Sequence, residues 1–164
     1  MAPACVYVFQ PMAADDLPMV RRWLATPHVA QWWGDPDQQF DLVSGDLGHP
    51  AMNQFIVAAD GRRFAYLQCY DPTAWIDNGF GPQPNGTRGI DQFIGEVDMV
   101  ARGHGSALIR GFVDDLLKAG TPRVLTDPSP ANARAIRACE KAGFEKRRVA
   151  DTPDGPVLLM VRDA

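Results

Sequence analysis

Residues 102–107 have the sequence Arg-Gly-His-Gly-Ser-Ala, and residues 127–132 have the sequence Asp-Pro-Ser-Pro-Ala-Asn. Each of these turns of small residues leads into a segment with the apolar spacing of an amphipathic helix. The start of a helix presents unpaired N–H groups and a partial positive charge, and glycine lets the main chain approach an anion closely. The two turns together therefore predict a site for a diphosphate, such as that of a phosphorylated cofactor.

The helix after the first turn is predicted from one apolar face, which carries Leu108, Ile109, Phe112, Val113, Leu116 and Leu117. Gly120 and Pro122 end this helix. The turn is not a P-loop, because no Gly-Lys-Ser/Thr follows it, and Leu108 stands where a dinucleotide-binding fingerprint has its third glycine. Taken alone, the Gly-His-Gly tripeptide is equally consistent with a plain turn.

Length and composition favour one domain, because 164 residues with 46% hydrophobic content suffice for a single core. No apolar run approaches the ~20 residues that cross a bilayer, and residues 1–5 lack the features of a secretion signal. We therefore expect a soluble, cytoplasmic protein with no membrane partner. Cys5, Cys69 and Cys139 are far apart, so we expect buried, reduced thiols rather than disulfides or a metal site.

The charges are divided unevenly along the chain. Residues 1–100 carry 5 Arg against 11 Asp and 1 Glu, whereas residues 101–164 carry 8 Arg and 3 Lys against 6 Asp and 2 Glu. An acidic half suits a cationic ligand and a basic half suits a phosphorylated one, although genome base composition also explains a preference for Asp and Arg. Lys and Arg are not clustered with aromatic residues, so we expect no nucleic-acid partner.

The predicted elements alternate in a way that places a β-α-β unit in the second half. They are a strand at 6–9, a helix capped by Asp15 or Asp16, a helix from Thr26 to Trp33, a hairpin of 55–59 with 64–70 across Asp60-Gly61, a long loop at 71–88, strands at 89–94 and 123–126, a helix from Ser129 to Gly143, and a hairpin of 145–150 with 157–162. The strands at 89–94 and 123–126 should be parallel with a right-handed crossover.

This order of elements and the two turns resemble the GCN5-related N-acetyltransferase (GNAT) superfamily. Its fold is of the α/β (α+β) class, with a mixed, splayed central β-sheet flanked by about four helices. Within it, the segments GIDQ (89–92), DPSP (127–130), RAIR (134–137), EKAGFE (140–145) and TPDGP (152–156) look like the aminoglycoside 6'-N-acetyltransferases. The resemblance is dense from Arg88 to Val161 and thinner before it, where QWWG (31–34) and the loop with Trp75 are recognisable.

The resemblance implies transfer of acetyl from acetyl-CoA to an amine, here the 6'-amine of an aminoglycoside, directly in a ternary complex. It implies a set of cofactor-binding residues: main-chain amides of Arg102, Gly103, His104, Gly105 and Ser106 for the pyrophosphate, main-chain groups of Phe93 and Ile94 for the pantetheine, and Asn132 near the pantetheine arm. Asn132 is equally explained as a polar residue in the first turn of a helix. The His104 side chain is expected to face solvent rather than a phosphate.

Asp91 is the expected catalytic residue, because attack on a thioester requires an uncharged nitrogen and the matching Asp of the aminoglycoside enzymes is assigned as the base. A more cautious role for it is to hold the ammonium group and to accept its proton as the tetrahedral intermediate forms. Carboxylates and aromatic rings suit a cationic, hydroxylated acceptor. The expected substrate-binding residues are Asp154, Asp77, Asp71, Trp75, Trp32 and Trp33. Of Trp32 and Trp33, one is expected to pack and the other to line the cleft, and Trp23 is expected in the core.

Two positions depart from the family pattern. Val100 and Ala101 stand where the glycine turn usually has Gln or Arg and often a further Gly. Cys139 stands where the family has the Tyr that is assigned as general acid to the thiolate. The thiolate, with a pKa of about 8.5, can also leave as the anion or take a proton from water.

Three alternatives therefore stay open: a GNAT enzyme for a siderophore hydroxylysine, one for a polyamine, and a non-catalytic module that binds CoA or a drug. The siderophore enzymes usually have His near Asp91 and Gln92, which this chain lacks. Both a monomer and a homodimer are compatible with the sequence.

Overall fold

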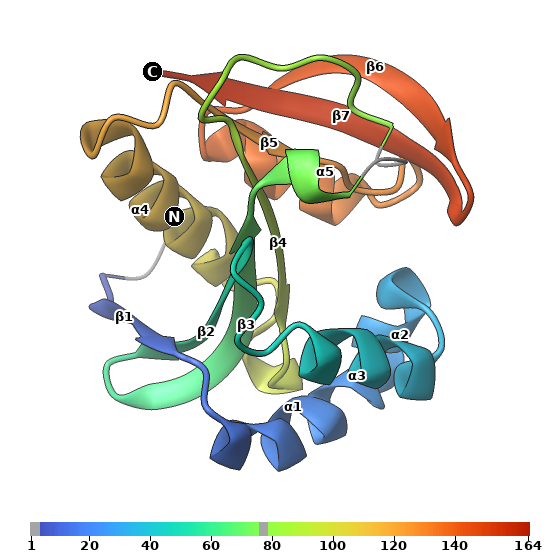
Figure 1. Cartoon of the computed structure of the whole chain (residues 1–164). Coiled ribbons are helices and arrows are strands. Elements are labelled where there is room, and N and C mark those ends of the chain that lie inside the picture. The colour runs from blue at the N-terminus through green and yellow to red at the C-terminus, as the bar shows by residue number, and fades with distance from the viewer. Residues whose placement is uncertain (1–3, 76–78) are drawn as a thin grey trace.

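The computed structural model describes residues 4–75 and 79–164, and its elements follow the predicted order (Figure 1). They are β1 (Tyr7–Pro11), α1 (Leu17–Leu24), α2 (Pro27–Trp33), α3 (Pro36–Gly45), β2 (Met52–Ala59), β3 (Arg62–Tyr70), β4 (Arg88–Ile94), α4 (His104–Lys118), β5 (Arg123–Thr126), α5 (Ala133–Lys141), β6 (Glu145–Thr152) and β7 (Gly155–Asp163). Short 3₁₀ turns lie at Ala14–Asp16, Pro72–Ala74 and Val97–Met99.

The seven strands form one mixed sheet in the order β1-β2-β3-β4-β5-β7-β6. Every neighbouring pair is antiparallel except β4 and β5, which are parallel as predicted. The ladder between β4 and β5 contains only the pairs Arg88–Val124 and Gly89–Leu125. Beyond these pairs the two strands diverge, so the sheet is splayed between them.

Helices cover both faces of the sheet. The central strands contribute side chains to both faces, because successive residues of a strand point to opposite sides. Val57, Leu67 and Ile90 pack in the cluster that contains the apolar faces of α4 and α5. Tyr66 and Phe93 pack in a second cluster with α1, α2 and α3. Figure 1 shows these three helices together on one side of β2–β4 and α4 on the other. No helix of the described residues is both long enough and apolar enough to span a membrane.

The hairpin of β2 and β3 forms across Asp60-Gly61 as predicted, although its strands are longer than predicted. Both turn residues have positive φ angles, 49° and 86°, as a two-residue turn of type I′ requires. The final hairpin also forms, with Pro153 and Asp154 between β6 and β7. The first strand is shifted, since it begins at Tyr7 and continues to Pro11.

Helix α3 was not predicted, so the described residues contain five α-helices rather than about four. Its start carried a signal, because the Asp35 carboxylate accepts a hydrogen bond from Gln38 N at 2.9 Å and Pro36 occupies the first helical position. The apolar periodicity is weak, since Val43 is the one fully buried side chain among the helix residues.

Helix α1 is attached to the end of β4 through Trp23, which is fully buried as expected. The Trp23 indole Nε1 donates to Glu96 Oε1 at 3.1 Å, and a Cβ atom placed on Gly95 would lie 2.2 Å from the indole ring. Any side chain at position 95 would therefore collide with the Trp23 ring in its present position.

We expect Gly95→Ala to destabilise the protein by about 1–3 kcal/mol, because the new methyl group must displace the Trp23 ring. Gly111→Ala is the matched control, since a Cβ atom there meets nothing within 4 Å and an alanine favours helix α4. Urea unfolding of both variants tests this, and equal stabilities would contradict the proposed contact.

Candidate active site

Two depressions lie on either side of the point where β4 and β5 separate. The first, here called the acidic cavity, has a volume of about 710 Å³ and is lined by Asp46, Asp91, Asp127 and Asp154 together with aromatic side chains. The second, the splay groove, has a volume of about 480 Å³ and is lined by residues of α2, β4, α4 and α5. A third pocket of about 330 Å³ contains Asp91, Asp127 and Asp154 from the cavity wall and Gln92 and Asn132 from the groove wall. It joins the two spaces.

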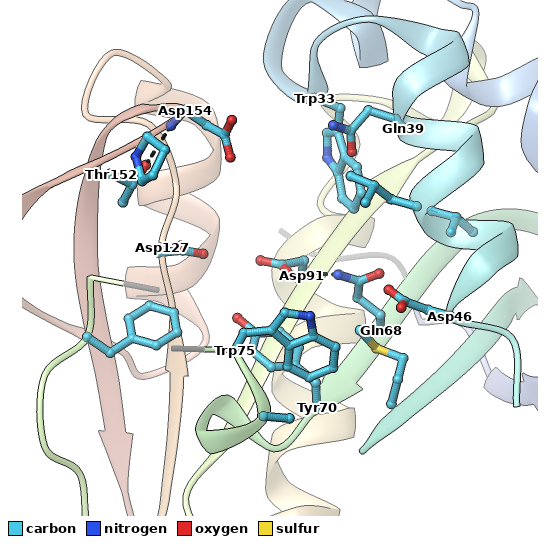
Figure 2. Close-up of a pocket in the computed structure, with 16 residues that line it drawn as sticks. Trp33, Gln39, Asp46, Gln68, Tyr70, Trp75, Asp91, Asp127, Thr152 and Asp154 are labelled. Atoms are coloured by element: carbon cyan, nitrogen blue, oxygen red, sulfur yellow. Dashed lines mark hydrogen bonds between the residues drawn. The ribbon is translucent and has the colours of Figure 1, made fainter. Parts of the chain in front are cut away.

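The acidic cavity collects carboxyl groups from four separate segments (Figure 2). Asp46 follows α3, Asp91 lies in β4, Asp127 follows β5, and Asp154 lies in the turn between β6 and β7. The described residues that line this cavity include no Lys or Arg. The cavity is therefore suited to a positively charged ligand, which would supply the missing counter-charge.

A chain of hydrogen bonds orients the Asp91 carboxylate. Gln68 Nε2 donates to Asp91 Oδ2 at 3.0 Å, and the Tyr66 hydroxyl donates to Gln68 Oε1 at 2.8 Å. Gln54 Nε2 donates in turn to the Tyr66 hydroxyl at 3.0 Å and to the Val43 carbonyl at 2.8 Å. Because the Tyr66 hydroxyl donates to the Gln68 oxygen, Gln68 presents its N–H and not its oxygen to Asp91.

Asp91 and Asp127 line the same two pockets, and each carboxyl group affects the pKa of the other. Burial, and then the charge of Asp91, raise the pKa of Asp127 well above its usual range. Burial also raises the pKa of Asp91, while hydrogen bonds from Gln68 and Asp127 oppose this rise. Burial likewise raises the pKa of Asp46, against the opposing charge of His49. An entering cation would favour the ionised form of all three groups.

Four further residues line the acidic cavity although no functional role was predicted for them: Asp127, Asp46, Gln68 and Tyr70. A signal for Asp127 was available. It directly follows β5, the parallel neighbour of the strand that carries Asp91, and neighbouring parallel strands bring such residues to the same crevice.

The expected substrate-binding residues fall into different places. Asp154 and Trp75 line the acidic cavity, and Trp33 lines all three spaces. Asp71 is not among the residues that line them, because its carboxylate caps a turn by accepting from Thr73 N at 3.0 Å and Thr73 Oγ1 at 2.8 Å. Asp77 lies outside the described residues.

The two neighbouring tryptophans do not divide their roles as expected. Trp33 both packs and lines, since its ring meets Phe93 edge-on at 5.0 Å between centroids while it also borders the cavity. Trp32 is 40% exposed and borders the splay groove.

The glycine turn before α4 has the backbone that an anion site needs. Gly103 is the N-cap of α4 with φ of 85°, and Ala101 also has a positive φ of 60°. The His104 side chain corrects our expectation, because it is 6% exposed and its Nδ1 lies 2.8 Å from the Tyr7 hydroxyl. The side chain is therefore turned away from solvent and is paired with Tyr7. Only the main-chain amide of His104 is then available to contact an anion at the turn.

The splay groove presents several polar groups along its walls. Asn132 is the N-cap of α5, with Oδ1 accepting from Ala135 N at 3.2 Å, and it also borders the groove. His28 Nε2 donates to the Ile94 carbonyl at 2.8 Å, so that oxygen already has a partner. Gln92, another residue without an assigned role, borders the groove with a buried Oε1 that has no hydrogen-bond partner among the described residues.

Cys139 borders the joining pocket and is 1% exposed. Burial, and then the charge of Asp91, raise the pKa of its thiol to about 12. Such a thiol holds its proton more tightly than an ordinary tyrosine, whose pKa is about 10, so Cys139 is a poorer proton donor than the tyrosine of the family pattern. Cys69 is buried as expected, whereas Cys5 is only half-buried, and all three thiols are free.

Residues 12–152 match the family model of the acetyltransferase (GNAT) domain. This chain belongs to the GNAT family. Its splayed sheet is that of the GNAT fold, and the crystal structure of aminoglycoside acetyltransferase AAC(6')-Ib in complex with coenzyme A and kanamycin matches it with a TM-score of 0.85 at 31% identity, covering 96% of this chain and 95% of that one.

Two sequence relatives of this GNAT chain carry names that refer to aminoglycosides. The aminoglycoside N(6')-acetyltransferase type 1 of Klebsiella pneumoniae is 34% identical over 163 residues, which cover 92% of this chain and 80% of the relative. The kanamycin resistance protein of Rhizobium radiobacter is 45% identical over 78 residues, covering 47% of this chain and 72% of that protein.

The carboxyl pair of this GNAT domain predicts a pH-dependent stability difference for Asp127→Asn. Folding raises the pKa of Asp127, so the folded protein holds a proton that the unfolded chain loses above about pH 4, and this cost to stability grows as pH rises. An asparagine at this position has no such proton to lose. We expect similar stabilities near pH 4 and a variant more stable by about 0.5–2 kcal/mol at pH 8.

Urea unfolding at several pH values measures this difference. Asp151→Asn is the control, because Asp151 is exposed on β6 and lines none of the three spaces. A stability difference between Asp127→Asn and the wild type that stays constant with pH would contradict the raised pKa of Asp127.

Proposed function

We propose that this chain transfers the acetyl group of acetyl-CoA to an amine of an aminoglycoside, the 6'-amine, directly in a ternary complex. The observation that carries the proposal is the pocket beside Asp91, which joins the acidic cavity to the splay groove. A carrier lying in the groove and a cationic acceptor lying in the cavity would bring thioester and amine to one point. The aminoglycoside acetyltransferases among its relatives support this choice of acceptor.

The carrier would bind mainly through main-chain groups. The amides of residues 102–106, at the N-terminus of the 15-residue helix α4, suit its pyrophosphate. Main-chain groups of Phe93 and Ile94 would pair with the pantetheine arm, which must share the Ile94 carbonyl with His28 or displace the His28 contact. The unpaired Oε1 of Gln92 offers a partner for an amide N–H of that arm.

The acceptor would bind through charge and ring contacts. An aminoglycoside carries several ammonium and hydroxyl groups, and the carboxyl groups of the acidic cavity can receive both. The rings of Trp33, Tyr70 and Trp75 border the same space and suit the flat faces of sugars and the cations on them. Entry of a cation beside Asp91 and Asp127 would lower the pKa of both carboxyl groups and so favour their ionised forms.

The chemical step follows from the position of Asp91. Its carboxylate takes one proton from the bound ammonium, and the nitrogen lone pair then attacks the thioester carbon. The tetrahedral intermediate loses the second N–H proton to a solvent water as the C–S bond breaks, and the sulfur leaves with the bonding electrons as the thiolate. Because Cys139 is a weak acid, the thiolate takes its proton from water.

The alternatives have less support. A spermidine N-acetyltransferase from Vibrio cholerae is 12% identical to this chain with a TM-score of 0.72, a likeness that concerns the fold alone. No observation favours a hydroxylysine acceptor. We further propose a cytoplasmic location, which the free thiols support because the cytoplasm is reducing.

We expect Asp91→Asn to lower kcat roughly 10²–10⁴-fold, the usual size of the contribution of a general base. Thiol release from acetyl-CoA with kanamycin as acceptor measures this, and calorimetric titration with kanamycin should find affinity largely retained. An unchanged kcat would remove Asp91 from its role as base. No turnover by the wild type with kanamycin, other aminoglycosides, polyamines or hydroxylysine would favour the non-catalytic binding module.

The positions of Asp154 and Asp71 predict different effects on the KM for kanamycin when each is changed to asparagine. Asp154→Asn should raise the KM for kanamycin roughly tenfold or more, because Asp154 borders the acidic cavity and a charge-assisted bond is worth about 1.5–3 kcal/mol. Asp71→Asn should leave this KM unchanged, because Asp71 caps its own turn. Steady-state kinetics of both variants tests the placement, and equal effects would contradict it.

A further inference from the structure

Residues 79–87, here called the wall segment, lie between the 3₁₀ turn at Pro72–Ala74 and β4 and have no regular secondary structure. Phe80 belongs to this segment, is 3% exposed, and borders the acidic cavity. Its ring packs in a cluster that contains Tyr70 and Leu125, with Trp75 packed against it. The shape of this side of the cavity therefore depends on how an irregular segment is held.

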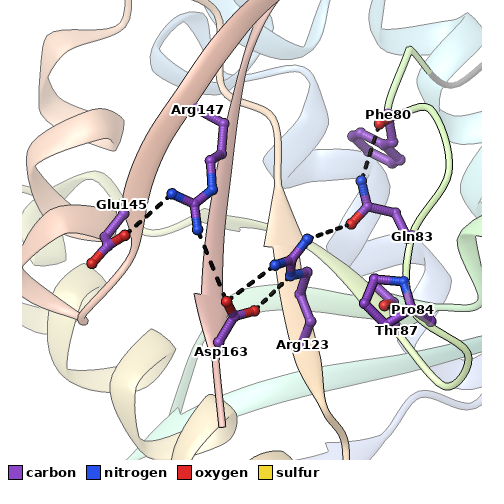
Figure 3. Close-up of polar contacts among 8 residues, drawn as sticks. All are labelled: Phe80, Gln83, Pro84, Thr87, Arg123, Glu145, Arg147 and Asp163. Atoms are coloured by element: carbon purple, nitrogen blue, oxygen red, sulfur yellow. Dashed lines mark hydrogen bonds and ion pairs between the residues drawn. The ribbon is translucent and has the colours of Figure 1, made fainter.

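A relay of hydrogen bonds holds the main chain at Phe80 (Figure 3). Asp163 of β7 accepts two hydrogen bonds from Arg123 of β5, at 2.5 Å from Nε and 3.1 Å from Nη2. The guanidinium fixed in this way donates through Nη1 to Gln83 Oε1 at 3.1 Å, and Gln83 Nε2 donates to the Phe80 carbonyl at 3.0 Å. The Gln83 amide thus uses its oxygen toward β5 and its N–H group toward Phe80.

A second contact holds the residue before Phe80. Arg148 Nη2, from β6, donates to the Gly79 carbonyl at 3.0 Å. A Cβ atom placed on Gly79 would lie 3.1 Å from the Thr152 methyl group, so the chain runs close against β6. At the other end of the segment, Thr87 Oγ1 donates to the Pro84 carbonyl at 2.7 Å and closes a turn. The wall segment is therefore fastened to the C-terminal strands at neighbouring carbonyl groups.

We propose that Gln83 is a positioning residue for the acceptor: by linking the Phe80 carbonyl to Arg123 it fixes the aromatic wall of the acidic cavity. Gln83 is not among the residues that line the cavity, so it acts through Phe80. The inference rests on the proposed function, which assigns this cavity to the aminoglycoside. It concerns acceptor affinity alone, because Phe80 is not among the residues that border the splay groove.

The test uses two substitutions at one position. Gln83→Ala removes both hydrogen bonds, and Gln83→Glu keeps an acceptor for Arg123 but cannot donate from its carboxylate to the Phe80 carbonyl. We expect both variants to raise the KM for kanamycin roughly tenfold, equivalent to about 1.4 kcal/mol, with kcat and the KM for acetyl-CoA within about twofold of wild type. Arg148→Gln should also raise the kanamycin KM, because it frees the Gly79 carbonyl.

Arg147→Gln is the matched control. Arg147 contacts Glu145 at 3.3 Å and Asp163 at 3.9 Å in the same network, and its side chain has no contact with the wall segment in Figure 3. This variant should keep the wild-type KM for kanamycin.

Three outcomes would overturn the inference. An unchanged kanamycin KM in Gln83→Glu would show that the link to Arg123 suffices. A parallel change in both KM values with a lower melting temperature would show a purely structural role. If the wild type turns over no aminoglycoside, the proposed function fails and the inference fails with it, whereas turnover with unaffected Gln83 variants removes the inference alone.

Discussion

The parallel ladder of β4 and β5 ends after Gly89 and Leu125, and both functional spaces depend on this early end. A backbone group without a ladder partner must find another one. Thr126 Oγ1 donates to the Ile90 carbonyl at 3.0 Å where the strands part, and His28 serves the Ile94 carbonyl farther along. Side chains therefore supply the hydrogen bonds that these two carbonyl groups would otherwise make with a neighbouring strand, and the strands can separate without leaving them unpaired.

The same divergence brings Asp91 and Asp127 together at the head of the groove. Partly buried carboxyl groups without Lys or Arg beside them are costly to ionise, and the raised pKa of Asp127 reflects that cost. This raised pKa lowers the stability of the protein at neutral pH, because the folded chain holds the Asp127 proton more tightly than the unfolded chain does. In this respect the acidic first half of the chain and the Asp-rich turns of the second half contribute to one cavity.

The C-terminal strands β5, β6 and β7 support the cavity from outside. Arg123 and Arg148 reach the wall segment from β5 and β6, and the turn between β6 and β7 supplies Asp154. The GNAT sheet thus has two roles in this chain: its splayed centre forms the groove, and its C-terminal strands hold the aromatic wall of the acidic cavity.

Local signals in the sequence determined much of the fold and the family. The apolar stripe of α4, the Asp60-Gly61 turn and the glycine bend before His104 each depend on residues close together in the chain, so their backbone could be predicted. Helix α3 was missed because a mostly exposed helix has little apolar periodicity. The motifs around Asp91 and Asp154 pointed to the family and to two residues of the cavity wall.

Only the tertiary structure decided what each polar side chain meets. The partner of His104 is Tyr7, 97 residues away, and Asp91 and Asp127 line the same cavity from two strands, whereas Asp71 is satisfied by Thr73 in its own turn. The physical reason is that a backbone conformation depends largely on neighbouring residues. Burial, pKa shifts and hydrogen-bond partners depend instead on groups that only the folded chain brings together.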